Sequence, residues 1–272
     1  MDVVSLGPLL MPSRGLIGIA ALLVALAVGA ALGHGRRVRI VDRLMAMALV
    51  GGLAARLVFV ATYAPLYIDA PLAILDIRDR GFSPWGGVAG LLLYAAVAGW
   101  RVRAARIPLA GALAAGALTL IIGTAGLQAV TPAHQPMPST ALARIDDTST
   151  TLTELKRQAP DKPMVVNLWA SWCGPCRREM PMLARYQAEH QAVTVVFVNE
   201  DDAVSAMHQF LRQTDLSLSN ALIDARHALA DALAIPGYPT TLFYDADGRL
   251  VRRHTGLLSQ ATLAHGVNQA AR

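Results

Sequence analysis

Four long and almost uncharged segments in the first half of the chain restrict its fold more than any other feature of the sequence. They cover residues 15–33, 44–64, 82–100 and 107–127. Each has about the 20 mainly apolar residues that a helix needs to cross a bilayer. Buried core helices are the alternative for the last two segments, but a core helix normally keeps a polar face, which these segments lack. The sequence therefore predicts an α-helical membrane domain with four transmembrane helices.

Two features inside these segments bear on helix packing. Arg56 interrupts the second segment, where a charge is costly and usually faces the bundle interior, a lipid head group or water; snorkelling toward an interface is the simpler alternative. Gly86 and Gly90 form a step that lets a neighbouring helix approach closely, although glycine is also common in membrane helices generally. We expect the face of these two glycines to dock the domain against a partner protein.

Composition indicates that a soluble domain follows. The mean hydropathy of +0.42, with 54% hydrophobic and 16% charged residues, is too apolar for one soluble domain of 272 residues. We predict a membrane domain over residues 1–129, a proline-rich linker over 130–140 and a soluble domain over 141–272. The net charge of +5 comes without a basic patch containing aromatic residues, so we expect no nucleic-acid partner.

The arginines of the loops predict the orientation in the membrane. Loop 34–43 holds Arg36, Arg37, Arg39 and Arg43, and loop 101–106 holds Arg101, Arg103 and Arg106. The positive-inside rule keeps both loops in the cytoplasm, so both termini should lie outside. A cleaved signal peptide is the alternative for the first segment, but its positive charge should precede the apolar run, whereas most arginines here follow it. We expect a multi-pass protein of the bacterial inner membrane with its C-terminal domain in the periplasm.

The first half resembles the prolipoprotein diacylglyceryl transferase family. The similarity covers about residues 5–127 and is carried by "SLGP" (5–8), "GGLAARLVF" (51–59) and "RGFSPWGGVAGLLLYAAVAGWRVR" (80–103). Arg56 matches an arginine of that family. However, Pro84 and Trp85 stand where the family has a histidine before its paired glycines, and a later signature with arginine and asparagine is missing. The resemblance therefore implies a membrane scaffold without transferase chemistry.

The second half alternates between strand and helix patterns. Apolar strand-like runs cover 164–170, 193–199 and 240–246, and the last leads through the Asp-Gly turn of "DADGRL" into 251–257, as in a hairpin. The helical patterns lie at 174–189, 203–214, 225–234 and 259–271. This order predicts an α/β sheet with one antiparallel edge.

The only two cysteines of the chain, Cys173 and Cys176, lie three positions apart. A structural zinc site would need a second pair of ligands, and the histidines are scattered. A structural disulfide that closes so short a loop would restrict the unfolded chain little. A redox-active dithiol is the remaining interpretation, because a CxxC motif after a predicted strand and at the start of a helix is typical of thioredoxin-type redox sites.

The predicted position of the motif explains the chemistry of such a site. At a helix N-terminus, unpaired N–H groups and the positive end of the helix dipole stabilise Cys173 as a thiolate. Cys176, one turn along, lies within reach of the first sulfur. Cys173 would attack a substrate disulfide, and Cys176 would then attack Cys173 and release the reduced substrate.

The region around the motif resembles the TlpA/ResA group of membrane-anchored thioredoxin-like proteins over about residues 140–272. "NLWASWCGPCRREMPML" (167–183) and "IPGYPTT" (235–241) carry the similarity. The resemblance implies a thioredoxin-like fold with Pro239 as a cis-proline beside the dithiol and with Tyr238 and Trp172 at the substrate-binding face. It also implies that Glu179 is an active-site glutamate; a solvated partner of nearby arginines is the alternative.

Two other positions refine the comparison. Asn167 stands where cytoplasmic thioredoxins carry a buried aspartate that transfers protons, so the proton acceptor of this chain must lie elsewhere. Pro181 matches a proline that kinks the same helix in the family.

Together these patterns predict a membrane-anchored periplasmic thiol:disulfide oxidoreductase that works as a reductase, without cofactor or metal. Its expected partners are disulfide-bearing protein substrates and membrane lipid. Residues 1–140 contain no cysteine, so the membrane domain cannot relay electrons by thiol exchange, and we expect a separate transmembrane donor of the DsbD/CcdA kind. The alternatives are a lipid-modifying, transferase-like membrane enzyme with a fused redox domain, a redox-dependent binding or sensor module, and an oxidase or isomerase direction.

Overall fold

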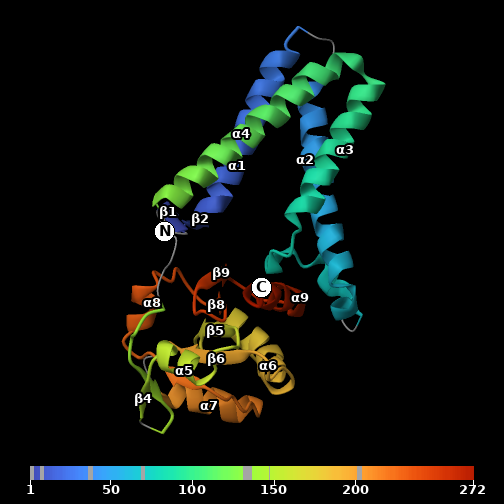
Figure 1. Cartoon of the computed structure of the whole chain (residues 1–272). Helices are drawn as coiled ribbons and strands as arrows, with labels where there is room; N and C mark the ends of the chain where they lie inside the picture. Colours follow the sequence, from blue (N-terminus) through green and yellow to red (C-terminus); the bar gives the residue numbers. More distant parts are fainter. Residues whose placement is uncertain are drawn as a thin grey trace. The chain divides into compact units, whose positions relative to one another are not determined.

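The computed structural model describes residues 3–6, 9–35, 39–68, 71–130, 137–146, 148–200 and 204–272. The chain divides into two units, one of Met1–Leu75 with Gly81–Ala133 and one of Asp76–Arg80 with His134–Arg272. Figure 1 colours both along the chain. Most of the predicted linker (131–136), and Arg36 and Arg37 of the first arginine-rich loop, lie outside the described residues.

The first unit is helical, as predicted. It begins with a short antiparallel pair, β1 (Val3–Leu6) and β2 (Leu9–Pro12). The four long helices that follow lie on the four predicted segments and are α1 (Ser13–Gly33), α2 (Ile40–Thr62), α3 (Pro84–Arg101) and α4 (Arg106–Val130). Short 3₁₀ turns lie between them: η1 (Ala64–Tyr67), η2 (Pro71–Leu75), η3 (Ile77–Asp79) and η4 (Arg103–Ala105). Helix α1 packs along α4, and α2 packs along α3 (Figure 1).

Three of these helical segments are long and apolar enough to cross a membrane: Gly15–Gly33, Ile40–Thr62 and Arg103–Ala129. Helix α3 falls short of that standard. Its 18 residues, about 27 Å, are long enough, but Pro84 and Trp85 at its start and Arg101 at its end lower its hydropathy. The fourth transmembrane helix therefore stays a prediction.

Gly86 and Gly90 are the contact points between α2 and α3. A Cβ atom at Gly86 would lie 2.7 Å from Cβ of Val58, and one at Gly90 would lie 2.6 Å from Cβ of Ala54. The predicted close approach of a neighbouring helix is thus confirmed, because only glycine leaves room for it. The expectation that this face docks a partner protein is wrong, since α2 already covers both glycines.

Arg56 turns inward from α2 and is buried. Its guanidinium donates hydrogen bonds to the carbonyl oxygens of Ala73 (3.0 Å), Ile74 (3.0 Å) and Gly81 (2.8 Å). The rings of three aromatic residues lie about 6 Å from its Cζ atom: Phe59, Tyr67 and Phe82. These partners offset the desolvation of the charge. Arg56 therefore faces the protein interior and ties the segment after η1 to α2.

The second unit contains a seven-stranded mixed sheet with the order β4-β3-β7-β6-β5-β8-β9. Its strands are β3 (Leu142–Arg144), β4 (Ser149–Thr150), β5 (Met164–Trp169), β6 (Thr194–Asn199), β7 (Ala221–Ile223), β8 (Thr240–Tyr244) and β9 (Leu250–Thr255). Strands β5, β6 and β7 run parallel, whereas β8 and β9 are antiparallel to their neighbours. The predicted α/β sheet and its β8–β9 hairpin are confirmed.

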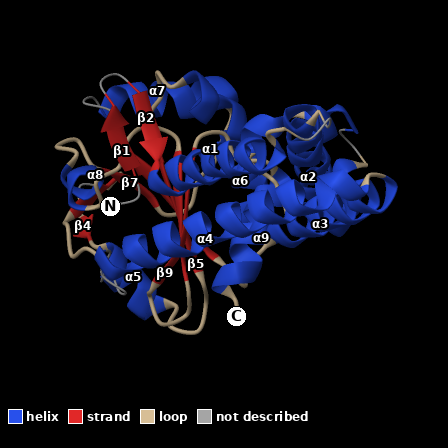
Figure 2. Ribbon diagram, turned by 90° about the horizontal axis from the view of Figure 1, so that it is seen from above, coloured by secondary structure: helices blue, strands red, loops and turns tan. Residues whose placement is uncertain are grey.

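Helices cover both faces of this sheet (strands red and helices blue in Figure 2). They are α5 (Leu152–Gln158), α6 (Gly174–Glu189), α7 (Val204–Thr214), α8 (Ala228–Ala232) and α9 (Gln260–Ala270). One core contains side chains of α6, α7 and α9, and the other contains those of α5 and α8. Strand β5 contributes alternate residues to the two cores and is buried throughout, as expected for a central strand.

In the second unit, four short elements were not predicted from the sequence. Strands β3, β4 and β7 have two or three residues each, and α5 has seven, which is too short for a periodic signal. Helix α8 is shorter than the predicted helix at 225–234. It begins three residues later, at Ala228, where the carboxylate of Asp224 accepts hydrogen bonds from the backbone N–H groups of Ala228 and Leu229.

Candidate functional site

The dithiol motif lies where the central strand β5 leads into α6. Cys173 is the N-cap residue of α6, and its Sγ accepts a hydrogen bond from the backbone N–H of Cys176 at 3.2 Å. The two sulfurs form a disulfide, with the Cα atoms 5.3 Å apart. Cys173 retains 5% exposure and Cys176 has none. The predicted place of Cys173 at a helix N-terminus is confirmed, and Cys173 presents the more accessible sulfur.

Glu179 lies one turn beyond Cys176 and is buried. Its Oε1 accepts a hydrogen bond from Nδ2 of Asn167 at 2.9 Å, and its Oε2 accepts one from the backbone N–H of Leu258 at 2.8 Å. Burial raises the pKa of Glu179 to about 7, although the two hydrogen bonds oppose that rise. The alternative of a solvated partner for nearby arginines is wrong. This carboxyl group can take up or release a proton near neutral pH.

Asn167 holds Glu179 in place. The side chain of Asn167 is fully buried on β5, and its Nδ2 also donates to Oγ1 of Thr241 on β8 at 3.0 Å. The carboxamide of Asn167 therefore orients the carboxyl group of Glu179 on α6.

The loop before β8 brings three more predicted residues together. The Tyr238–Pro239 peptide bond is cis, as predicted. Thr240, the next residue, pairs with Leu168 on β5, so this loop lies at the same end of the sheet as the dithiol. The ring of Tyr238 meets the ring of Trp172 edge-on, with centroids 6.2 Å apart. Trp172 is 71% exposed. The rings of Trp172, the residue before Cys173, and Tyr238 thus form one aromatic surface, called the aromatic wall below.

Sequence reasoning missed a second buried carboxyl group, that of Glu200. Glu200 directly follows β6, and its backbone N–H donates to the carbonyl oxygen of Trp169 at 2.8 Å. Its Oε2 lies 3.0 Å from Nδ1 of His227 and accepts a hydrogen bond from the hydroxyl group of Tyr238 at 3.3 Å. Burial raises the pKa of Glu200 to about 7. An acidic residue just after a buried parallel strand was the available signal, since such strand ends meet at one edge of the sheet.

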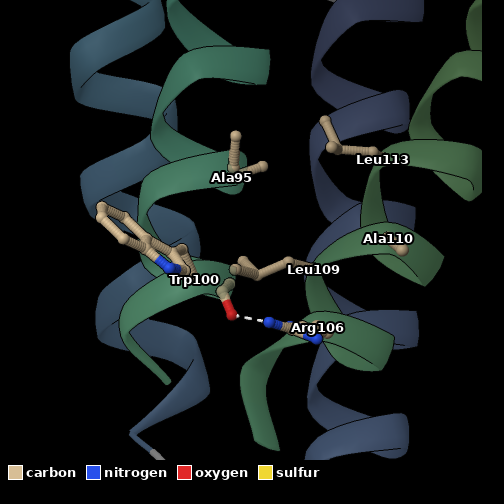
Figure 3. Close-up of a pocket in the computed structure, with 8 residues that line it drawn as sticks. Ala95, Trp100, Arg106, Leu109, Ala110 and Leu113 are labelled. Carbon is tan, nitrogen blue, oxygen red and sulfur yellow. Dashed lines mark hydrogen bonds between the residues drawn. The ribbon is translucent and has the colours of Figure 1, made fainter. Parts of the chain in front are cut away.

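The helical unit contains an open groove of about 300 Å³ between α3 and α4. Small and apolar residues line it together with Arg106: Ala95, Ala96, Gly99, Trp100, Leu109, Ala110 and Leu113. Figure 3 shows Nε of Arg106 donating to the carbonyl oxygen of Gly99, at 2.8 Å. These lining residues include no carboxylate or histidine that could act as a general base.

The second unit has the parts of a thioredoxin-like thiol-disulfide oxidoreductase: a CxxC disulfide at the start of the helix after the central strand, and a cis-proline loop at the same sheet edge. Comparison with known proteins agrees. Residues 132–266 match the Redoxin family model, and residues 2–126 match the prolipoprotein diacylglyceryl transferase model. The two halves of the chain thus match two different family models, and both predicted resemblances are confirmed.

Several relatives match the redox part of the chain. Thiol-disulfide oxidoreductase ResA of Bacillus subtilis is 28% identical over 127 residues, which are 46% of this chain and 69% of that protein. Thiol:disulfide interchange protein DsbE of Pseudomonas aeruginosa is 29% identical over 126 residues, 46% of this chain and 68% of that protein. The thioredoxin-like protein YneN of Bacillus subtilis is 32% identical over 108 residues, 38% of this chain and 62% of that protein.

Among solved structures, a secreted Mycobacterium tuberculosis disulfide oxidoreductase homologous to E. coli DsbE is similar. Its sequence identity is 28% and its TM-score is 0.41, with 48% of this chain and 95% of that chain covered.

Proposed function

We propose that the protein is a membrane-anchored thiol-disulfide reductase, with a multi-pass anchor in the bacterial inner membrane and its redox unit in the periplasm. The observation that carries the proposal is the Cys173–Cys176 disulfide at the N-terminus of α6, with the buried carboxyl group of Glu179 one turn away. Three helices long and apolar enough to cross a membrane support the anchor.

In the proposed reaction, two electrons pass from the reduced dithiol to a substrate disulfide. The thiolate of Cys173 attacks one substrate sulfur; a Cys173–substrate disulfide forms, the substrate S–S bond breaks and the other sulfur leaves as a thiolate. The thiolate of Cys176 then attacks Sγ of Cys173. This step forms the Cys173–Cys176 bond and releases the second substrate sulfur. The substrate is reduced, and the dithiol is oxidised to the disulfide.

Glu179 is the proposed proton acceptor for Cys176. The Cys176 thiol must lose its proton before it can attack, and Cys176 is fully buried. Glu179 follows it by one helical turn, and its pKa of about 7 suits a group that exchanges protons at neutral pH. In this role Glu179 takes over the function that the aspartate serves in cytoplasmic thioredoxins.

Trp172, Tyr238 and Pro239 are the proposed substrate-binding residues. The exposed ring of Trp172 offers an apolar surface beside Cys173. Tyr238 lies just before β8, and its backbone N–H and C=O take part in none of the backbone hydrogen bonds within the described part of the chain. These groups can pair with an extended segment of a disulfide-bearing protein, as in strand addition.

The proposed reductase needs an external source of electrons. Both cysteines of the chain belong to the redox motif, so the membrane unit has no thiol that could carry electrons across the bilayer. We therefore propose a separate transmembrane thiol donor of the DsbD/CcdA kind. Membrane lipid surrounds the anchor.

Substitution of the second cysteine tests the reaction. Cys176→Ser should accumulate mixed disulfides with substrate proteins through Cys173, because the resolving thiol is gone. Non-reducing gels of cells trapped with acid and an alkylating agent would reveal these adducts. The matched variant Cys173→Ser should form none with natural substrates. Equal adducts in both variants, or none in either, would contradict the assigned roles, and stable non-covalent complexes without turnover would favour a binding or sensor module.

A further inference from the structure

Glu200 and His227 lie outside the dithiol chemistry, yet they contact its aromatic wall. The side chain of Glu200 is fully buried, whereas that of His227 is 40% exposed. Both partners of Glu200, the Nδ1 atom of His227 and the hydroxyl group of Tyr238, lie against a single oxygen, Oε2. The other oxygen, Oε1, is buried without a hydrogen-bond partner among the described residues. A carboxyl group so deeply buried is costly unless specific partners hold it there.

The other charged groups nearby do not satisfy Glu200. Asp224 is buried close to it, and its negative charge helps to raise the pKa of Glu200. However, the oxygens of Asp224 accept hydrogen bonds from the backbone N–H groups at the start of α8. Burial and the negative charge of Glu200 raise the pKa of the Tyr238 hydroxyl group, and the negative charge of Asp231 adds to that rise. Among these neighbours, His227 and Tyr238 are the hydrogen-bond partners of the carboxyl group.

The cluster connects to the dithiol through Tyr238. One end of this residue, its hydroxyl group, binds Glu200, and its ring packs edge-on against Trp172, the residue before Cys173. Tyr238 also directly precedes the cis-proline Pro239. His227 adopts a left-handed backbone conformation, with φ of 54°, at the N-cap position of α8. Non-glycine residues seldom adopt this conformation, so the fold holds the backbone of His227 in an uncommon geometry.

We propose that Glu200 and His227 are a positioning pair that fixes the ring of Tyr238, and through it Trp172, and so determines how tightly a polypeptide disulfide docks beside Cys173. The inference rests on the proposed reductase function and deepens it. Because the pair acts on the binding wall and not on the sulfurs, its loss should weaken the docking of a peptide substrate but leave the reduction of a small disulfide unchanged.

Two probes separate docking from chemistry. The first is Ellman's reagent, a small aromatic disulfide; the second is a peptide of about ten residues whose cysteine is joined to the same thionitrobenzoate group. The full chain in nanodiscs is reduced, freed of reductant and mixed with each probe in single turnovers, and the release of thionitrobenzoate is followed. His227→Ala should raise the half-saturating peptide concentration about fivefold, which is the loss of roughly one hydrogen bond. Its rate with Ellman's reagent should stay within twofold of wild type.

Further variants make the test specific. Arg226→Ala removes an exposed neighbour of His227 and should match wild type with both probes. Tyr238→Phe should reproduce the docking defect, because it removes only the hydroxyl group. In wild type, peptide docking should weaken as the pH falls through about 7, where Glu200 gains its proton, and Glu200→Gln should remove this dependence. The fluorescence emission of Trp172 is obtained as the difference between the spectra with and without Trp172→Phe. Its emission maximum should shift in His227→Ala.

Three results would overturn the inference. One is an unchanged half-saturating peptide concentration together with unchanged Trp172 emission in both His227→Ala and Tyr238→Phe. Another is an equal loss with both probes in His227→Ala, which would place the pair in the dithiol chemistry itself. The last is a failure of the reduced wild type to reduce Ellman's reagent, which would remove the proposed function and the inference with it.

Discussion

At the scale of single residues, burial decides what Glu179 can do. In the sequence it follows two arginines, Arg177 and Arg178, and a solvated ion pair is as consistent with that pattern as an active-site role. In the fold it points inward, and its hydrogen-bond donors come from Asn167, 12 positions away, and Leu258, 79 positions away. The CxxC motif could be read from the sequence because its spacing is local. The environment of Glu179 could not, since it is assembled from distant strands and loops.

Glu179→Gln should change the pH dependence of the resolving step. A general base must be deprotonated to accept a proton, so the rate at which Cys176 resolves the mixed disulfide should rise in wild type as the pH passes about 7. The glutamine variant should lack this rise and be slower by about 10²-fold or more at pH 8. Stopped-flow measurements between pH 5 and 9 follow the rate at which Cys176 resolves a preformed mixed disulfide. An identical pH profile in both proteins would remove Glu179 from the mechanism.

Stability provides a control for the same substitution. The pKa of Glu179 is raised from 4.5 to about 7, so between these values the folded state keeps a proton that the unfolded state has lost. This group therefore makes stability fall as the pH rises through that window, by up to about 1.4 kcal/mol per pH unit. The raised pKa of Glu200 makes stability fall over the same pH range. Burial lowers the pKa of His254 to about 4, which makes stability rise with pH and opposes this fall. The pH dependence of stability is therefore compared between the variant and wild type. Hydrogen exchange of the β5 amides should show a flatter pH dependence in Glu179→Gln.

At the scale of elements, the contact between α2 and α3 depends on glycine. Gly86 and Gly90 on α3 meet Val58 and Ala54 of α2 with no room for a side chain. The sequence predicted this close approach but not its partner, because a small-residue step does not say which helix will cover it. The structure assigns that role to α2 of the same chain. The short strands at the sheet edge were missed for a related reason: they are defined by their neighbours and not by their own pattern.

Gly90→Ala should destabilise the helical unit. Its new Cβ would lie 2.6 Å from Cβ of Ala54 and 3.2 Å from Cα of Gly51, so the two helices must move apart. We expect a loss of about 1–3 kcal/mol. The matched control is Gly52→Ala on α2, whose Cβ would meet nothing within 4 Å and which should stabilise the helix or leave it unchanged. Thermal unfolding in one detergent, followed by circular dichroism, compares the two. Equal unfolding midpoints for both variants would show that the contact does not need glycine.

At the scale of the whole molecule, the compartment of the redox unit depends on the number of membrane crossings. Helix α3, at about 27 Å, is close to the roughly 30 Å of the hydrocarbon core, and it packs along α2. Arg101 ends this helix, and Arg103 and Arg106 follow it. Four crossings with both arginine-rich loops in the cytoplasm place the redox unit outside, whereas three crossings would place it inside.

Reporter fusions after residue 130 distinguish these topologies. Alkaline phosphatase, which is active only outside the cytoplasm, should be active when fused there, and a fluorescent protein that matures only inside should stay dark. Fusions after residue 103 should give the opposite pattern, because that loop is expected in the cytoplasm. A bright fluorescent fusion after residue 130 would mean that α3 does not cross, and the periplasmic assignment would fail.

The central claim, that this chain is a reductase outside the cytoplasm, is tested most directly by the redox state of its two cysteines in growing cells. Rapid acid quenching followed by alkylation with a mass-shifting reagent separates the dithiol from the disulfide on a gel. We predict that Cys173 and Cys176 are mostly reduced at steady state and accumulate as the disulfide in cells that lack transmembrane thiol donors. A pair that is oxidised in normal cells, or that stays reduced without those donors, would contradict the account.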